Sequence, residues 1–147
     1  MKHFIDISNF KLEKLNSIIK KAKEIKKNPK KFSNKCKHKT LGMIFQKDST
    51  RTRASFTVGF QKLGGNTIEL NSKSIGFGKR ESVEDILRTL AQYIDVLVIR
   101  NDDHELLNKL RALNALPIIN GLTDMSHPCQ ILSDMLCLLY TSPSPRD

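Results

Sequence analysis

Short apolar runs alternate with helical segments along this 147-residue chain, and this alternation limits its fold more than any other feature. The run Thr40–Phe45 is followed by a helical segment at about 50–63. The same strand-and-helix unit then recurs, with strands expected at 66–70, 96–99 and 116–119 and helices at 82–93, 103–113 and 128–139. Such alternation is typical of βαβ units. The sequence therefore predicts an α/β fold in which a parallel sheet of about four strands is flanked by helices.

Several helix ends carry residues with known conformational preferences. Apolar positions at steps of three and four predict a first helix over 10–27, and Asn28-Pro29 stops it. Further signals are Gly64-Gly65 as a C-terminal cap, Ser82 with Asp85 as a variant capping box, and Pro128 at the first position of the last helix. The stretch 71–81 is expected to be a loop.

The net charge of +10 comes from one end of the chain. Residues 1–40 contain thirteen lysines, no arginine and three acidic residues, so the remaining residues are neutral overall. This pattern is typical of a solvated helix face, and few aromatic side chains accompany it that could stack on bases. We expect no nucleic-acid partner, with a nucleic-acid contact by this lysine-rich segment as the alternative.

Nothing in the sequence predicts a membrane span, a leader or a metal site. The most apolar stretch, Ile131–Tyr140, is interrupted by Ser133 and Asp134. The first ten residues lack the apolar core of a signal peptide, so we expect a cytoplasmic protein without membrane partners. The cysteines form no C-x-x-C pair and are expected to be reduced thiols: Cys36, Cys129 and Cys137.

Ligands of open parallel sheets bind beyond the carboxyl ends of the strands. In this chain that rule selects four segments: 46–53, 71–81, 100–103 and 120–130. The second contains Gly76-Phe77-Gly78-Lys79-Arg80, but it lacks the spacing of a nucleotide-binding P-loop, so we reject that function for it.

The first segment places hydroxyls and guanidiniums at the start of a helix. It reads Lys47-Asp48-Ser49-Thr50-Arg51-Thr52-Arg53. Free backbone N–H groups and the helix dipole favour an anion at such a position. The segment therefore predicts a phosphate site. The alternative is that Ser49 only caps the helix while the arginines point into water.

Two more strand ends supply polar side chains. Arg100 follows the strand at 96–99 and is expected at the same sheet edge, although it could instead pair with a nearby acid, Asp102 or Asp103. His127-Pro128-Cys129-Gln130 lies at the last strand-to-helix junction, where it places a titratable donor and an amide close together. A lone histidine is more often structural than catalytic, so that alternative stays open.

These motifs, in this order, resemble the carbamoyl-phosphate domain of the carbamoyltransferases, and among them the ornithine carbamoyltransferases most. The resemblance covers about residues 1–137. The residues that carry it are Ser-Thr-Arg-Thr-Arg at 49–53, Glu81-Ser82-x-x-Asp85, Arg100, Asn120-Gly121-Leu122-Thr123-Asp124 and His127-Pro128-Cys129-Gln130.

The resemblance implies roles for these residues. Ser49, Thr50 and Thr52 would hold the phosphate of carbamoyl phosphate with Arg51. Arg100 and His127, the expected catalytic residues, would polarise the carbamoyl carbonyl together with Thr52. Gln130 would accept a hydrogen bond from the carbamoyl amino group, and Pro128 and Cys129 complete the expected substrate site.

The implied reaction transfers the carbamoyl group to the δ-amine of ornithine, giving citrulline and phosphate, without a metal or organic cofactor. It belongs to arginine biosynthesis or catabolism. Family members are expected to be homotrimers with a second, ornithine-binding domain. We expect that domain to be absent here, with 1–137 as a C-terminally truncated carbamoyl-phosphate-binding domain and 138–147 as an unrelated or linker tail. Aspartate, N-acetylornithine or putrescine as acceptor, and a non-catalytic anion-binding fragment, are the alternatives.

Overall fold

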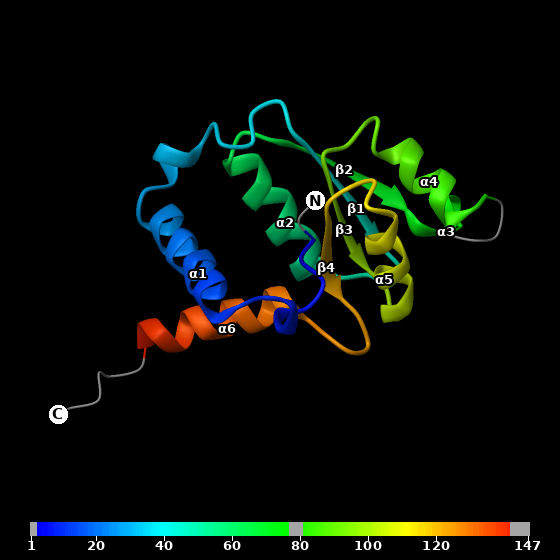
Figure 1. The fold of residues 1–147 in the computed structure, drawn as a ribbon. Helices are drawn as coiled ribbons and strands as arrows, with labels where there is room; N and C mark the ends of the chain where they lie inside the picture. The colour runs from blue at the N-terminus through cyan, green and yellow to red at the C-terminus, as the bar shows by residue number, and fades with distance from the viewer. Residues whose placement is uncertain (1–2, 77–80, 142–147) are drawn as a thin grey trace.

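Four parallel strands form the central sheet of the protein, in the order β2-β1-β3-β4 (Figure 1). The structure, a computed structural model, describes residues 3–76 and 81–141. The strands are β1 (Thr40–Phe45), β2 (Asn66–Asn71), β3 (Val96–Arg100) and β4 (Ile118–Leu122). The predicted α/β class and its four-stranded parallel sheet are confirmed.

Four of the predicted helices are present within two residues of their expected bounds: α1 (Leu12–Lys27), α2 (Thr50–Lys62), α5 (His104–Leu113) and α6 (Pro128–Thr141). The fifth, α4 (Val83–Leu90), is present but ends three residues earlier than expected. Three short elements were not predicted: η1 (Ile7–Asn9), η2 (Pro29–Phe32) and α3 (Ser72–Ile75). The last of these lies in the stretch expected to be a loop. Residues 77–80, which hold most of the rejected P-loop candidate, lie outside the described residues.

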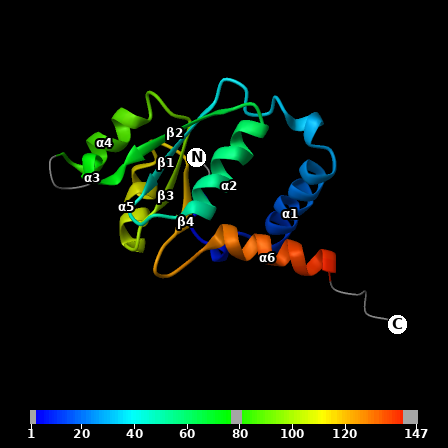
Figure 2. The ribbon, with the colours of Figure 1, turned by 180° about the vertical axis from the view of Figure 1, so that it is seen from behind.

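Helices cover both faces of the sheet, which explains why its two central strands, β1 and β3, are buried and read as continuous apolar runs. Helices α4 and α5 lie on one face and α2 on the other (Figures 1 and 2). Leu87 of α4 and Leu107 of α5 are fully buried in the first layer. On the opposite face, Phe56 and Phe60 of α2 pack against a cluster that includes Met43 of β1.

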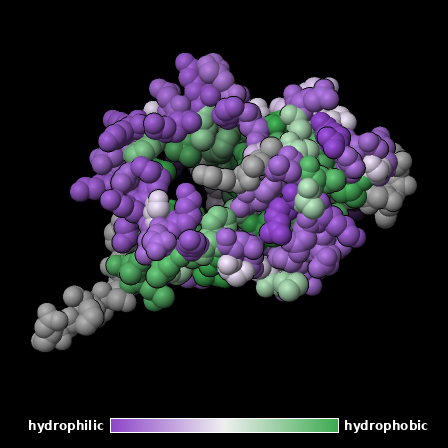
Figure 3. Space-filling model, viewed as in Figure 1, coloured by the Kyte–Doolittle hydropathy of each residue, from purple (hydrophilic) through white to green (hydrophobic). Residues whose placement is uncertain are grey.

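Helices α1 and α6 lie outside these layers (Figure 1). Hydrophilic side chains cover α1, whereas apolar side chains gather over α6, where Leu138 and Leu139 are 62% and 59% exposed (Figure 3). Among the described residues, no helix combines the length and apolar character needed to cross a membrane. No disulfide joins the three cysteines.

The prediction of the fourth strand was wrong by two residues at its start and by three at its end. It was expected at 116–119, but β4 runs from Ile118 to Leu122. The sequence Asn120-Gly121 resembles a turn, yet here it continues the strand through a bulge, because Ile99 pairs with Asn120 and Arg100 pairs with Leu122. Asn120 is consequently fully buried inside the fold rather than exposed in a loop.

The predicted caps are present. The Ser82 hydroxyl accepts a hydrogen bond from the Asp85 amide at 3.0 Å at the start of α4. After α2, Gly64 adopts the left-handed conformation with φ +88°, and its neighbouring space is filled because an added Cβ would overlap the carbonyl oxygen of Ser33. Backbone conformation and close approach both require glycine at this position.

We therefore predict opposite effects of two glycine-to-alanine changes near this helix. Gly64→Ala should lower the free energy of unfolding by about 1–2 kcal/mol or more, because it forces a side chain into the left-handed region. Gly59→Ala, in the middle of α2 with nothing within 4 Å of the new Cβ, should raise it by up to about 1 kcal/mol. Urea unfolding of the two variants measures both effects, and equal stabilities would contradict this account.

Candidate functional site

The carboxyl ends of β1 and β3 lie side by side and bring two of the predicted segments together. In the parallel pairing of these strands, Phe45 is opposite Arg100. The backbone continues this contact beyond the strand, where the Gln46 amide donates to the Arg100 carbonyl at 2.9 Å. The loop that leads into α2 and the side chain of Arg100 therefore share one edge of the sheet.

Arg100 binds the first turn of α2 directly. Its guanidinium donates to the Ser49 hydroxyl at 2.9 Å and to the Thr52 hydroxyl at 3.3 Å. Ser49 is also the N-cap of α2, because its oxygen accepts from the Thr52 amide at 3.4 Å, and its hydroxyl donates to the Thr52 hydroxyl at 2.8 Å. The Ser49 side chain thus caps α2 and also binds Arg100, so the capping role considered in the sequence analysis does not exclude a role in an anion site.

The alternative partners of Arg100 are engaged elsewhere. Asp102 forms an ion pair with Lys47 at 2.6 Å, and the Asp103 carboxylate caps α5 by accepting from the Leu106 amide at 3.0 Å. The surface pairing considered for Arg100 was therefore wrong. The physical reason is that Arg100 ends a buried strand and extends along the sheet edge toward α2.

Arg51 lies at the same helix start but has no partner among the described residues. Its side chain is exposed, as is that of Thr50. The amides of both residues belong to the first turn of α2, where no intrahelical acceptor is available. Two backbone donors, the positive end of the helix dipole and an unpaired guanidinium therefore point to the binding of an anion.

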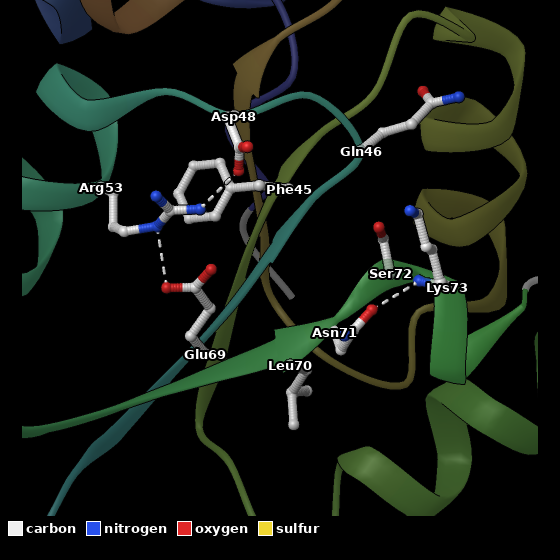
Figure 4. A pocket seen from close by; sticks show the side chains of 9 residues that line it. All are labelled: Phe45, Gln46, Asp48, Arg53, Glu69, Leu70, Asn71, Ser72 and Lys73. Atoms are coloured by element: carbon white, nitrogen blue, oxygen red, sulfur yellow. Dashed lines mark hydrogen bonds and ion pairs between the residues drawn. The ribbon is translucent and has the colours of Figure 1, made fainter.

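Arg53, two residues later, has a different environment. It forms ion pairs with Glu69 of β2 at 2.8 Å and with Asp48 at 3.2 Å, and its guanidinium lies 5.2 Å from the centre of the Phe45 ring (Figure 4). Hydrogen bonds to Asp48 and Glu69 raise the pKa of Arg53. These residues line a polar pocket of about 500 Å³ beside β2. Arg53 thus ties α2 to the sheet instead of pointing into water.

His127 stands at the end of the loop after β4, just before α6. Its Nδ1 atom is buried without a hydrogen-bond partner among the described residues. Burial lowers the pKa of His127 below its ordinary value of 6.5, the positive charge of Arg100 lowers it further, and Asp134 opposes both effects. The imidazole is consequently neutral at pH 7, in a position where it senses the charge of Arg100.

The three residues after His127 have unequal environments. Pro128 is buried at the start of α6, as predicted. The Cys129 thiol donates to the Asn120 carbonyl at 3.7 Å, and burial raises its pKa to about 11, so it is a protonated packing group at neutral pH. Gln130 is exposed and donates to the Asp134 carboxylate at 2.8 Å, so it is not joined to Arg100 by a hydrogen bond.

Sequence reasoning missed the residues that tie the loops of this edge together. Gln46 accepts from the Asp102 amide at 3.0 Å, which adds to the Lys47–Asp102 ion pair. Gln46 and Lys47 directly follow β1, and this position was the signal that could have identified them. The sequence could not show that Asp102 is their shared partner. In the described part of the protein, no three His, Cys, Asp or Glu side chains are grouped as a metal site requires.

Comparisons with known proteins agree with this geometry. Residues 2–139 match the family model described as aspartate/ornithine carbamoyltransferase, carbamoyl-P binding domain. The ornithine carbamoyltransferase of Chlorobaculum tepidum is 48% identical over 120 residues, which are 82% of this chain and 35% of that protein. The enzyme of the same name from Listeria monocytogenes is 42% identical over 93% of this chain and 43% of its own length.

A solved structure supports the same assignment. Ornithine carbamoyltransferase from Pyrococcus furiosus superposes with a TM-score of 0.90 at 35% sequence identity, covering 95% of this chain and 45% of that one. The chain thus spans less than half the length of each of these three relatives. Sequence, fold and site geometry agree that this chain belongs to the aspartate/ornithine carbamoyltransferase family and matches its carbamoyl-phosphate-binding domain.

Proposed function

We propose that this chain is the carbamoyl-phosphate-binding part of an ornithine carbamoyltransferase, with residues 1–137 as that domain. The whole protein would transfer the carbamoyl group to the δ-amine of ornithine, giving citrulline and phosphate. One observation carries the proposal: the guanidinium of Arg100 crosses from β3 to the first turn of α2, where it binds Ser49 and Thr52. Arg51 of the same turn has no partner among the described residues, and the charge of Arg100 also acts on His127.

The start of α2 would hold the phosphate. The amides of Thr50 and Arg51 and the hydroxyls of Ser49 and Thr52 supply neutral donors, and the helix dipole adds a favourable field. The Arg51 guanidinium would add a charged, bidentate contact, which is stronger than a neutral hydrogen bond. The exposed side chain of Arg51 can reach a ligand without breaking an existing ion pair.

Arg100 and His127 would act on the carbonyl. Attack by a neutral amine forms a C–N bond and places negative charge on the carbonyl oxygen. The bond from the carbonyl carbon to the phosphate oxygen then breaks, and the nitrogen loses one proton, which the departing phosphate can accept. Donors fixed in advance at that oxygen lower the barrier, because they need not reorganise as charge develops. Arg100 binds Ser49 and Thr52 through Nη1 alone, so the N–H groups on its other nitrogens are available to the carbonyl oxygen. Gln130 would accept a hydrogen bond from the carbamoyl amino group.

The acceptor is assigned from similarity. Asn120-Gly121-Leu122-Thr123-Asp124 with His127-Pro128-Cys129-Gln130 resembles the ornithine enzymes, and the relatives compared above carry that name. Aspartate, N-acetylornithine or putrescine remain alternative acceptors, and a non-catalytic anion-binding fragment is the alternative from another class. The homotrimer, the cytoplasmic location and the role in arginine metabolism stay predictions, as does the separate tail at 138–147.

Replacement of Arg51 tests the phosphate site. Arg51→Ala should weaken carbamoyl-phosphate binding by about 10- to 100-fold, since a hydrogen bond to a charged group contributes about 1.5–3 kcal/mol. Isothermal titration calorimetry measures the change. Arg111→Ala, near the end of α5, removes the same charge from an exposed position away from this sheet edge and should leave the affinity nearly unchanged. Equal losses in both variants would contradict a specific site.

The state of His127 gives a second prediction. Its imidazole should titrate below 6.5 in NMR spectra, and Arg100→Gln should raise its pKa without restoring the ordinary value, because burial is the larger cause. The unfolded chain binds this proton more readily, so the contribution of His127 to stability is present above pH 6.5 and is lost as the pH falls toward its folded pKa. A His127 pKa at or above 6.5 would refute this environment.

A further inference from the structure

We propose that Thr123 and His104 are positioning residues for His127, holding the loop that ends at this histidine through a chain of hydrogen bonds anchored in α5. The catalytic meaning of this inference rests on the proposed function. Neither residue belongs to the substrate site expected from the sequence, and both act at a distance from it.

The ring of His127 has no direct hydrogen bond to hold it within residues 3–76 and 81–141. Its Nδ1 atom is buried and unpartnered, and no other described side chain donates to the ring or accepts from it. In many active sites a carboxylate or carbonyl orients the histidine ring. Here the backbone just before His127 must define where the ring lies.

That backbone is closed into a compact turn by Thr123. The Thr123 amide donates to the Ser126 carbonyl at 3.0 Å, and the Ser126 amide donates back to the Thr123 hydroxyl oxygen at 3.1 Å. The same hydroxyl lies 3.3 Å from the Ser126 carbonyl. Thr123 is only 5% exposed, so these bonds face little competition from water. The residue that precedes His127 is thereby fixed through both of its backbone polar groups.

A second anchor joins this turn to the interior. Asn120 is fully buried, and its amide donates to the Ser126 carbonyl at 3.1 Å and to the Ile5 carbonyl at 2.9 Å. Its side-chain oxygen accepts from the Leu122 amide at 2.9 Å. Asn120, which lies in β4 next to the bulge, therefore helps to hold the turn that precedes His127.

His104 connects the turn to α5. Its Nδ1 atom lies 2.8 Å from the Thr123 hydroxyl oxygen, and either tautomer of His104 satisfies this contact because the hydroxyl can donate or accept. His104 is the first residue of α5, whose position is set by the Asp103 cap and by the fully buried side chains of Leu107 and Leu110. The contact between His104 and Thr123 thus connects α5, which is packed into the core, to the turn before His127.

The test compares variants that remove or keep the polar contact. Thr123→Val keeps the shape but loses the hydroxyl, and His104→Ala loses the ring; Thr123→Ser and His104→Asn retain a polar group as matched controls. NMR titration of the His127 imidazole and calorimetry with carbamoyl phosphate are the two readouts. Arg100 and Asp134 are the charged groups that act on His127, and all four variants keep them.

We expect the His127 pKa to move toward 6.5 in Thr123→Val and His104→Ala, because a loosened turn exposes the ring to water. Carbamoyl-phosphate affinity should fall about tenfold in both, since a small misplacement of a binding group is costly. The Ser and Asn variants should stay within about twofold of the parent chain. A purely structural role would lower the free energy of unfolding without moving the pKa of the folded protein.

An unchanged His127 pKa in folded Thr123→Val and His104→Ala overturns the inference. If Thr123→Val does not fold, His104→Ala decides alone, because its side chain is only half-buried and its loss leaves the core intact. If the parent chain fails to bind carbamoyl phosphate, the proposed function fails, while the pKa comparison still decides whether Thr123 and His104 position His127.

Discussion

The parallel pairing of β1 with β3 is the constraint on which the site depends. Chain order would make β2 the natural neighbour of β3, yet β1 lies between them and places the end of its strand opposite Arg100. This pairing is what allows a guanidinium from β3 to reach hydroxyls at the start of α2. The backbone bond from Gln46 to Arg100 extends the contact past the last pair of the ladder. Both faces of these strands are buried, so a slip in register would expose apolar side chains and is strongly opposed.

Helix geometry explains why Arg51 and Arg53, two arginines of one motif, have different environments. Residues two apart are separated by about 200° around a helix, so Arg51 and Arg53 lie on nearly opposite sides of α2. Arg53 faces the sheet, where Glu69 of β2, Asp48 of the loop before α2 and the ring of Phe45 in β1 hold it. Arg51, on the other side of α2, is exposed and has no partner in the part of the chain that the structure describes. The motif therefore contains one guanidinium that attaches α2 to the sheet and one that is available to a ligand.

Local signals in the sequence predicted most of the elements, whereas contacts between distant segments were beyond its reach. The strand Thr40–Phe45 was predicted with its observed bounds, because an apolar run between polar residues defines a buried strand well. The fourth strand was displaced, since Asn120-Gly121 has turn propensity and only its pairing with Ile99 and Arg100 extends the sheet. Arg100 was recognised as a candidate from its position after a strand. Its hydroxyl partners lie about fifty residues away in the chain, so only the fold could identify them.

A neutral histidine beside an arginine has a consequence for binding. The burial of the ring and the charge of Arg100 both disfavour imidazolium, so the free protein keeps His127 mostly as an uncharged group with one donor and one acceptor. An anion bound close to Arg100 offsets the positive field and must raise the pKa of His127, because opposite charges favour the charged form. By linkage, proton uptake at His127 and anion binding then strengthen each other by equal free energies. The same proximity that keeps the imidazole neutral in the free protein thus makes it sensitive to the charge of the ligand.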